Sequence, residues 1–155
     1  MNNYDAIIIG FGKGGKTLAI DLASRNWKVA VVERSAGMYG GTCINIGCIP
    51  TKSLAYQAKI TDFKQINSFN EQKDYYELAI QNKHQLITSL RQKNYDNLDN
   101  KDEITIYTGE ASFKSDHEVL VKNDSGSITL SAEKIFINTG AETIIPNIKG
   151  LKESN

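Results

Sequence analysis

The segment Tyr4–Glu33 restricts the fold of this chain more than any other part of the sequence. An uninterrupted apolar run in Tyr4–Ile9 predicts a buried strand, which stops at a glycine. Lys16–Arg25 has apolar residues at helical spacing, and Lys28–Val32 predicts a second buried strand that ends on Glu33. This succession of strand, glycine turn, helix and strand predicts an α/β fold with a parallel sheet.

The turn after the first strand matches G-x-G-x-x-G through Gly10, Gly12 and Gly15. Gly10 allows the tight turn, Gly12 lets the backbone approach a pyrophosphate, and Gly15 lets the helix pack closely on the sheet. The helix N-terminus adds amide donors and positive potential, and Glu33 can accept hydrogen bonds from a ribose diol. We therefore predict dinucleotide binding, although the fingerprint does not separate FAD from NAD.

The only two cysteines of the chain, Cys43 and Cys48, lie within Gly40–Lys52. In an ideal helix they would be separated by a rise of about 7.5 Å, whereas bridged Cα atoms lie within about 7 Å of each other. Gly47 and Pro50 disturb the backbone of the same turn, so the sequence permits a distorted first turn that brings the thiols together. A short strained loop of this kind is typical of a reducible disulfide.

Three kinds of chemistry are open to this cysteine pair when it is taken alone: a disulfide, a metal site, or small apolar residues in a core. No metal is predicted, because a zinc site would stay half filled without further soft ligands. A thiol-dependent mercuric activity, however, would need only the pair. Thr42 is expected to cap the cysteine helix and to leave its amide donors near both thiols, which would lower a thiol pKa and favour the thiolate.

Two helices are expected in the middle of the chain. The cysteine helix should continue to about Ile60, a polar connection should follow over Thr61–Asn70, and a long helix should run from about Glu71 to Leu98. His84 on this helix is interpreted as a surface residue. The apolar stripe of the long helix consists of Tyr76, Ala79, Ile80, Leu86, Ile87 and Leu90.

The hydrophobic period changes to two from Glu103 onward, which predicts strands. The expected strands are Ile104–Tyr107, a bend into another at 109–113, a hairpin of Glu118–Lys122 with Ser127–Ser131, and a buried strand Lys134–Asn138. His117 lies at the entry to the hairpin and is expected to have a turn or edge role. The end of the last strand should lie beside the end of the first, so the backbone at Thr139 and Gly140 should approach the same ligand.

Charge and composition point to no polyanionic partner. The 155 residues contain 18 Lys and Arg against 18 Asp and Glu, so no strong field attracts nucleic acid or an anionic membrane. Lys13 and Lys16 can assist a phosphate, but a solvated helix start explains them equally well. A signal-peptide core is not recognised at the N-terminus, and a cytoplasmic location is expected. In a reducing compartment a close cysteine pair more often indicates redox or metal chemistry.

Taken together, these motifs resemble the N-terminal portion of a class I pyridine nucleotide-disulfide oxidoreductase. This is the family of glutathione reductase, dihydrolipoamide dehydrogenase and mercuric reductase. The resemblance rests on GFGKGG, Glu33, GGTCINIGCIPTK and INTGA. GFGKGGKTLA and MYGGTCINIGCIPTK are most similar to the bacterial branch associated with reactive chlorine resistance and hypothiocyanous acid reduction. The implied fold is an incomplete Rossmann-like FAD-binding domain, with a parallel sheet, helices and a small antiparallel hairpin or meander.

The resemblance also implies roles for individual residues. Cys48 would be the charge-transfer thiol beside the flavin, Cys43 the interchange thiol that attacks substrate, and Lys52 a group near the flavin ring. The positions that match FAD contacts are Gly10, Gly12, Gly15, Glu33, Gly41, Thr42, Ala111, Thr139 and Gly140. The implied cycle passes a hydride from NAD(P)H to FAD and two electrons on to the Cys43–Cys48 disulfide. The resulting dithiol would reduce a disulfide, a small-molecule oxidant or a metal ion.

Members of the family continue into an NAD(P)H-binding domain, a second part of the FAD domain and a dimerisation domain whose histidine reaches the partner's active site. Neither His84 nor His117 matches that histidine. We therefore expect residues 1–155 to be the N-terminal part of an FAD-binding domain from a homodimeric parent. The chain alone should be inactive in NAD(P)H oxidation, and its flavin binding should be weak or absent.

The alternative is a dinucleotide-binding module without redox chemistry, which would bind NAD or FAD through Glu33. It predicts that Cys43 and Cys48 are dispensable core residues. Titration of free thiols separates the two hypotheses, because the redox hypothesis fails if both thiols stay reduced under a mild oxidant.

Overall fold

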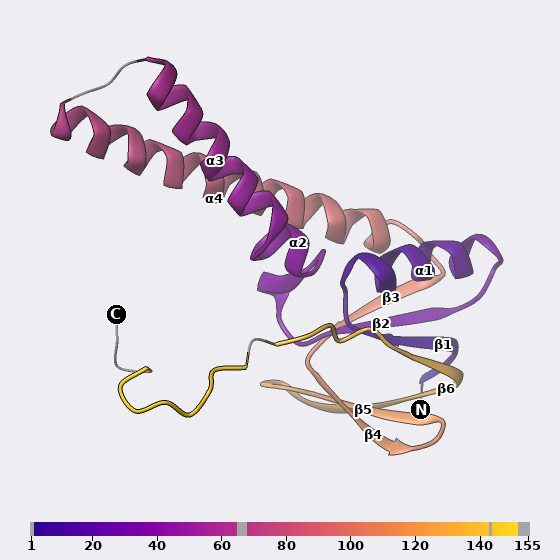
Figure 1. Ribbon diagram of the computed structural model, residues 1–155. Coiled ribbons are helices and arrows are strands. Elements are labelled where there is room, and N and C mark those ends of the chain that lie inside the picture. Colours follow the sequence, from indigo (N-terminus) through magenta and orange to yellow (C-terminus); the bar gives the residue numbers. More distant parts are fainter. Residues whose placement is uncertain (1, 65–67, 143, 152–155) are drawn as a thin grey trace.

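The computed structural model describes residues 2–64, 68–142 and 144–151, and Figure 1 shows how its helices and strands are arranged. The elements in chain order are β1 (Asn2–Ile9), α1 (Lys13–Ser24), β2 (Val29–Glu33), the 3-10 helix η1 (Ala36–Met38), α2 (Thr42–Asn45), α3 (Cys48–Phe63), α4 (Phe69–Asp99), β3 (Ile104–Thr108), β4 (Glu110–Ser115), β5 (Glu118–Asn123) and β6 (Gly126–Ile137).

A six-stranded mixed sheet in the order β3-β2-β1-β6-β5-β4 forms the centre of the molecule. The first four strands of this order are parallel, and β5 and β4 continue the sheet in antiparallel pairing. Ile9 at the end of β1 pairs with Val32 of β2 and with Ile137 of β6. The predicted α/β fold with a parallel sheet and a small antiparallel part is therefore confirmed.

The predicted break between strands 127–131 and 134–138 is wrong, because β6 runs without interruption over Gly126–Ile137. Pairing with the neighbouring strands on both sides keeps β6 continuous. β5 pairs with the first half of β6, and β1 pairs with Leu130–Ala132 and again with Lys134–Ile137. Its far end is also less buried than expected, since the side chain of Ile137 is 67% exposed.

The core occupies both faces of the parallel strands. On one face, α1 and the end of α4 pack against β1 and β2, with Phe11, Ala19 and Leu98 completely or almost completely buried. On the other face, Ile7 and Val32 pack with Val119 and Val121 of β5. Contacts of β4 with β2 and of β5 with β3 show that the antiparallel strands fold back over this second face.

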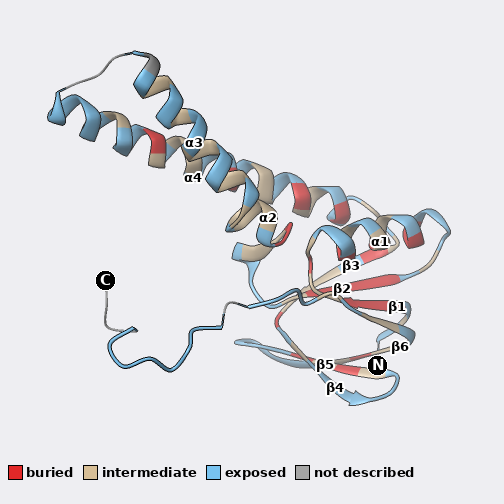
Figure 2. Cartoon of the chain, in the orientation of Figure 1, coloured by how far each residue is buried: buried red, intermediate tan, exposed pale blue. Residues whose placement is uncertain are grey.

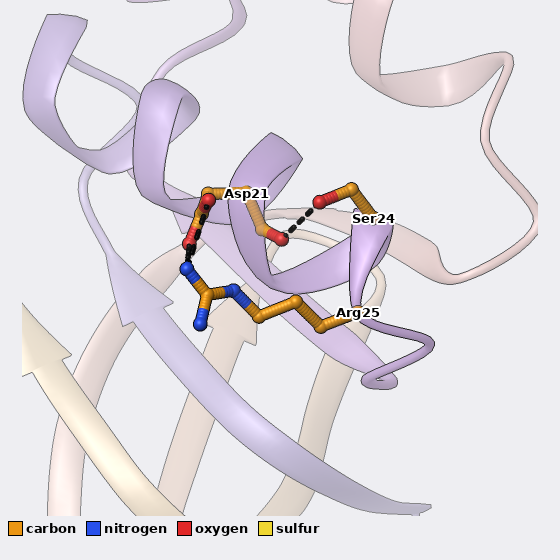
Figure 3. Close-up of polar contacts among 3 residues, drawn as sticks. All are labelled: Asp21, Ser24 and Arg25. Atoms are coloured by element: carbon orange, nitrogen blue, oxygen red, sulfur yellow. Dashed lines mark hydrogen bonds and ion pairs between the residues drawn. The ribbon is translucent and has the colours of Figure 1, made fainter.

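Helix α1 begins at Lys13, three residues earlier than its predicted start at Lys16, because Gly12 occupies the N-cap position. It ends at Ser24, where Figure 3 shows the contacts of its last turn. There the Arg25 guanidinium lies 3.0 Å from the Asp21 carboxylate, and the Ser24 hydroxyl donates to the Asp21 carbonyl at 2.6 Å. Asn26 then takes a positive φ of 61° and turns the chain toward β2.

Helices α3 and α4 pack along each other and extend away from the sheet (Figure 1). We call α3 together with residues 69–87 of α4 the helical arm. Figure 2 shows that buried residues concentrate in the sheet, in α1 and at the sheet end of α4, whereas the helical arm is mostly exposed. In the part of the chain that the structure describes, no helix combines the length and apolar character needed to cross a bilayer.

The predicted apolar stripe of α4 is buried only in part. Ala79 and Ile87 are buried as expected, but the side chains of Tyr76 and Leu86 are 64% and 41% exposed. The reason is geometric, since α3 is the helix that packs along this stretch in the described part of the chain and covers a narrow strip of α4. His84 is exposed, as expected for a surface residue. The predicted connection over Thr61–Asn70 is shorter, and its residues 65–67 lie outside the described part of the chain.

Candidate functional site

The glycine turn after β1 is too tight for other side chains at two of its positions. Gly10 has a φ of +108°, and a Cβ there would lie 2.2 Å from the carbonyl oxygen of Asn138. A Cβ on Gly15 would lie 2.3 Å from the carbonyl oxygen of Gly10. Contacts below 3.0 Å cannot be relieved when the neighbour is backbone, so glycine at both positions lets α1 and β6 close on the end of β1.

Asn138, for which no role was predicted, holds this turn together. Its backbone amide donates to the carbonyl of Ile9 at 2.8 Å, and its side-chain amide donates to the carbonyl of Gly10 at 3.3 Å. A Cβ on Gly12 or Gly14 would come within 3.2 or 2.9 Å of the Asn138 side chain. Its place directly before Thr139, after a strand expected to end beside β1, was the signal that could have identified it.

Glu33 stabilises the turn from the neighbouring strand. Its Oε2 accepts a hydrogen bond from the amide of Phe11 at 3.0 Å, and its Oε1 accepts one from the amide of Ser35 at 3.1 Å. Each carboxylate oxygen can accept a second hydrogen bond, so the group keeps capacity for a ligand hydroxyl. The carbonyl of Glu33 also accepts from the amide of Gly109 at 2.9 Å, which connects the site to the strand carrying Ala111.

The cysteine segment docks directly on the glycine turn. The amide of Gly40 donates to the carbonyl of Phe11 at 3.1 Å. A Cβ on Gly41 would lie 2.6 Å from the Cα of Gly12, so the two glycines touch through their backbones. This contact places the residues after Gly41 beside the start of α1.

The two cysteines lie in two separate helical segments instead of one kinked helix. Cys43 is in α2, the chain breaks its helical path at Ile46 and Gly47, and Cys48 is the first residue of α3. The amide of Gly47 donates to the carbonyl of Thr42 at 2.8 Å and closes the intervening turn. The distorted helical turn expected from the sequence is therefore present, and it divides the segment into two helices.

The expected capping role of Thr42 is wrong. Gly41, with a φ of 77°, occupies the N-cap position of α2, and among the described residues no side chain of an N-cap position makes a capping hydrogen bond in α2 or α3. Thr42 lies one residue further along, inside the first turn, and is exposed. Glycine takes the cap because the chain needs a positive φ where it leaves the contact with Gly12.

Both cysteines are free thiols, with Cys43 half-buried and Cys48 exposed. A hydrogen bond to Cys48 raises the pKa of the Cys43 thiol, and burial and the charge of Cys48 raise it further. The charges of Lys13 and Lys52 act in the opposite direction and lower this pKa. The prediction of a lowered pKa is therefore wrong for Cys43, since the neighbouring sulfur outweighs the cations.

Lys16 and Asn94 form a polar contact between α1 and α4, next to Gly40 at the start of the cysteine segment. The Lys16 ammonium donates to the Asn94 side-chain oxygen, and the Asn94 side-chain amide donates to the carbonyl of Leu90 at 2.6 Å. Asn94 is 6% exposed and packs against Gly40. Burial lowers the pKa of Lys16, as does the charge of Lys13, while Cys43 raises it. The predicted helix from Glu71 to Leu98 included Asn94 without a role of its own.

Asn45 is a third asparagine for which no role was predicted from the sequence. Its side-chain amide donates to the carbonyls of Tyr39 and Gly41 at 3.0 and 2.9 Å. Its side-chain oxygen accepts a hydrogen bond from Arg91 Nε of α4 at 2.8 Å. Asn45 therefore joins the loop before the cysteines to the long helix.

The remaining predicted site residues are Thr139, Gly140, Lys52 and Ala111, and they lie on three different segments. Thr139 and Gly140 are exposed and follow β6 beside Gly10, and no atom of the described residues lies within 4 Å of the position of a Cβ on Gly140. Lys52 is exposed on α3. Ala111 is half-buried in β4, where it pairs with Val121.

His117 lies outside this site. It follows β4 in a turn, as expected, and its Nδ1 lies 3.2 Å from the carbonyl oxygen of Ala132. The structure thus brings the glycine turn, Glu33, Asn138 and the cysteine segment together at the carboxyl ends of the parallel strands. This is the edge where open α/β sheets bind their ligands.

Known proteins match nearly the whole chain. The family described as pyridine nucleotide-disulphide oxidoreductase matches residues 4–155. The probable pyridine nucleotide-disulfide oxidoreductase RclA of Escherichia coli is 47% identical over 152 residues, covering 97% of this chain and 32% of the relative. The mercuric reductase of Bacillus cereus is 35% identical over 156 residues, covering 97% of this chain and 24% of the relative.

Solved structures give the same result for the fold. The Cu(II) complex of the HOCl-induced flavoprotein disulfide reductase RclA from Escherichia coli superposes with a TM-score of 0.85 at 46% identity, covering 98% of this chain and 32% of that one. A second structure of the HOCl-induced flavoprotein disulfide reductase RclA gives a TM-score of 0.83 at 45% identity, covering 96% and 31%. The chain thus spans a quarter to a third of the length of these relatives.

Proposed function

Because the chain belongs to the pyridine nucleotide-disulphide oxidoreductase family, we propose that it is the FAD-binding and redox-disulfide part of an NAD(P)H-dependent flavoprotein. Cys43 and Cys48 are its redox pair. The observation that carries this proposal is the placement of two free thiols on either side of the turn between α2 and α3, which the hydrogen bond from the Gly47 amide to the Thr42 carbonyl closes at 2.8 Å. Cysteines that served only as core residues would be buried, whereas Cys43 is half-buried and Cys48 is exposed.

The residues at the carboxyl edge of the sheet fit a bound FAD. The first intrahelical hydrogen bond of α1 runs from the Lys16 amide to the Gly12 carbonyl at 3.0 Å, so the preceding amides of the first turn are free for a pyrophosphate. Glu33 has unused acceptor capacity for a ribose, and the surroundings of Gly140 are open. The residues proposed to hold FAD are Gly10, Gly12, Gly15, Glu33, Gly41, Thr42, Lys52, Ala111, Thr139 and Gly140.

FAD, when bound, would supply the electron pair that opens the Cys43–Cys48 disulfide. In this proposal Cys48 faces the flavin and Cys43 meets the substrate. Cys48 is exposed in the structure, which leaves room beside its sulfur for a ring system. The short turn at Ile46 and Gly47 keeps the two cysteines in neighbouring positions, as re-formation of the disulfide requires.

A disulfide substrate would be reduced in two thiol–disulfide exchange steps. The Cys43 thiolate attacks one substrate sulfur, a mixed disulfide forms, and the other half of the substrate leaves as a thiolate. The Cys48 thiolate then attacks the Cys43 sulfur, the intramolecular disulfide forms, and the second half leaves. The pair loses two electrons and two protons, which the two released thiols gain. The proximity of Cys48 makes the second step intramolecular and fast.

Family membership also leads us to propose the substrate class, the oligomeric state and the location of the parent protein. The substrate is a small-molecule disulfide, an oxidant or a metal ion, as the names of the mercuric reductases suggest for the last of these. We further propose a homodimeric parent located in the cytoplasm, without a nucleic-acid or membrane partner.

The test is a redox titration of the purified chain. The chain is equilibrated in mixtures of reduced and oxidised dithiothreitol, free thiols are trapped, and the Cys43–Cys48 disulfide is quantified by mass spectrometry. We expect one reversible two-electron transition within the monomer, absent from Cys43→Ser and Cys48→Ser. Thiols that stay reduced in every mixture would refute the redox function and leave the non-redox dinucleotide module. Flavin absorbance after addition of FAD tests the nucleotide site separately.

A further inference from the structure

We propose that Tyr39 is a positioning residue for the thiol pair, because it connects the segment before Cys43 to the glycine turn, to β3 and to α4. Its ring, its hydroxyl and its carbonyl each contact a different part of the chain. The inference rests on the proposed function in one respect, that Cys43 and Cys48 act together on substrate. It adds a residue outside the Gly40–Lys52 motif that keeps the two sulfurs within reach of each other.

The ring of Tyr39 contacts two other aromatic rings. It meets the ring of Phe11 edge to face at a centroid distance of 5.2 Å and the ring of Tyr95 at 5.0 Å. Phe11 is completely buried in the glycine turn, and Tyr95 belongs to α4. Aromatic pairs at such distances contribute stabilisation beyond the area that they bury. The side chain of Tyr39 therefore joins two segments that are distant in the sequence.

The hydroxyl of Tyr39 adds a contact with the edge strand of the sheet. It shares a hydrogen bond of 2.5 Å with the hydroxyl of Thr108, the last residue of β3. The next residue, Gly109, donates its amide to the carbonyl of Glu33 at 2.9 Å. The Tyr39 hydroxyl is therefore bonded to a strand end that is itself held by the strand carrying the proposed ribose acceptor.

The carbonyl of Tyr39 extends these contacts to the helix that carries Cys43. It accepts a hydrogen bond from the Asn45 side-chain amide at 3.0 Å, and Asn45 and Cys43 both belong to α2. Residues 34–37 of the same loop are exposed, whereas Tyr39 packs against the core. Without its contacts, α2 would sample more positions relative to Cys48 on α3, and the two sulfurs would meet less often.

Tyr39→Phe tests the hydroxyl, since it keeps the ring and removes the hydrogen bond to Thr108. The first readout is the equilibrium with dithiothreitol, in which the thiol pair passes two electrons and two protons to oxidised dithiothreitol as the Cys43–Cys48 disulfide forms. We expect this equilibrium to move about threefold toward the dithiol, as loss of one hydrogen bond that orders the pair would cause. Thr108→Val should have the same effect, and the double variant should have no larger one.

The second readout is the affinity of the reduced pair for phenylarsine oxide. This reagent condenses with two thiols, forms two As–S bonds and releases one water, so it binds tightly only where two sulfurs are held close together. Its affinity should fall about threefold in Tyr39→Phe. The measurement needs neither flavin nor a disulfide, so it tests the positioning role of Tyr39 even where the redox titration has refuted the redox function.

Tyr4→Phe is the matched control. The Tyr4 hydroxyl shares a hydrogen bond of 2.6 Å with the Tyr107 hydroxyl, and both residues pack on the other face of the sheet. Both Tyr→Phe variants should lose similar stability in urea denaturation, but only Tyr39→Phe should change the two thiol readouts.

Three results would overturn the proposal. One is a folded Tyr39→Phe whose arsenical affinity equals that of Tyr4→Phe. Another is a wild-type chain that binds phenylarsine oxide no more tightly than Cys48→Ser does, because then no pair is held together. If Tyr39→Phe fails to fold by circular dichroism, Thr108→Val decides the outcome, and an unchanged arsenical affinity in that variant is the third.

Discussion

Two kinds of residue shape the glycine turn at the carboxyl edge of the sheet. Glycines allow close backbone contacts, and polar side chains hold the backbone by hydrogen bonds. Gly10 and Gly15 allow backbones to meet, and Asn138 fills the space that they leave. Glu33 uses both carboxylate oxygens to hold backbone amides, one of them within the glycine turn. The turn is therefore shaped before any ligand binds, which reduces the ordering cost of binding.

The clearest structural prediction at this scale concerns Gly15→Ala. The new methyl group would collide with the Gly10 carbonyl oxygen at 2.3 Å, and backbone cannot move away as a side chain can. We expect a loss of about 1–3 kcal/mol in the free energy of unfolding, as in other overpacked sites, measured by urea denaturation. Gly37→Ala is the control, because its Cβ would lie at 3.4 Å from Ser35 Oγ without strain. Equal stabilities of the two variants would contradict the packing described.

The pH dependence of Cys43 gives a second prediction. The hydrogen bond to Cys48 is the largest cause of the raised pKa of Cys43, so removal of its partner should lower that pKa. Alkylation of Cys43 by iodoacetamide should therefore rise at lower pH in Cys48→Ala than in Cys48→Ser, whose hydroxyl can keep the hydrogen bond. The measurement is the rate of Cys43 alkylation across the pH range. Coinciding profiles would show that the thiol contact does not control the titration.

At the scale of elements, the short helix α2 depends on its neighbours for its position. It has four residues, too few to be stable alone. Asn45 connects it to the preceding loop and, through Arg91, to α4, while Gly40 and Gly41 attach it to the glycine turn. The position of Cys43 is thus set by the loop before α2 and by two parts of the chain that are distant in the sequence, α4 and the glycine turn.

This dependence predicts coupling between Asn45 and Arg91. Asn45→Ala removes three hydrogen bonds and should cost about 1–3 kcal/mol, because it leaves half-buried polar groups without partners. In a double-mutant cycle with Arg91→Ala the interaction energy should be about 0.5–1.5 kcal/mol. Arg25→Ala is the control, since its exposed ion pair with Asp21 should contribute only a few tenths of a kcal/mol. Additive effects of the Asn45 and Arg91 substitutions would exclude the coupling.

The sequence predicted those elements whose cause is local. The run from β1 through the glycine turn to β2 was predicted because period, glycines and the final acid all lie within one short segment. The split between α2 and α3 and the continuity of β6 were not predicted, because contacts with Gly12 and with β1 decide them. Asn45, Asn94 and Asn138 were missed for the same reason, since an asparagine shows its role only through partners distant in the chain.

For the whole molecule, the distribution of burial separates two regions of different expected stability. The parallel strands are covered on both faces, and Ile7, Ile8 and Val31 are completely buried. The helical arm buries little beyond Ala79 and Ile87 (Figure 2). The cysteines lie where the arm joins the sheet, so α3 connects Cys48 to the less buried region.

Hydrogen exchange should resolve these two regions. Amides of β1 and β2 should exchange only on global unfolding, whereas residues 55–62 of α3 and 70–78 of α4 should exchange through local opening, because few buried contacts hold them. Exchange measured by mass spectrometry on peptides from both regions, with and without a mild denaturant, distinguishes the two mechanisms. Only the exchange of the sheet peptides should share the denaturant dependence of global unfolding. If amides of the arm peptides exchanged as slowly as those of β1, the helical arm would belong to the same cooperative unit as the sheet. The low burial of its side chains would then not determine its stability.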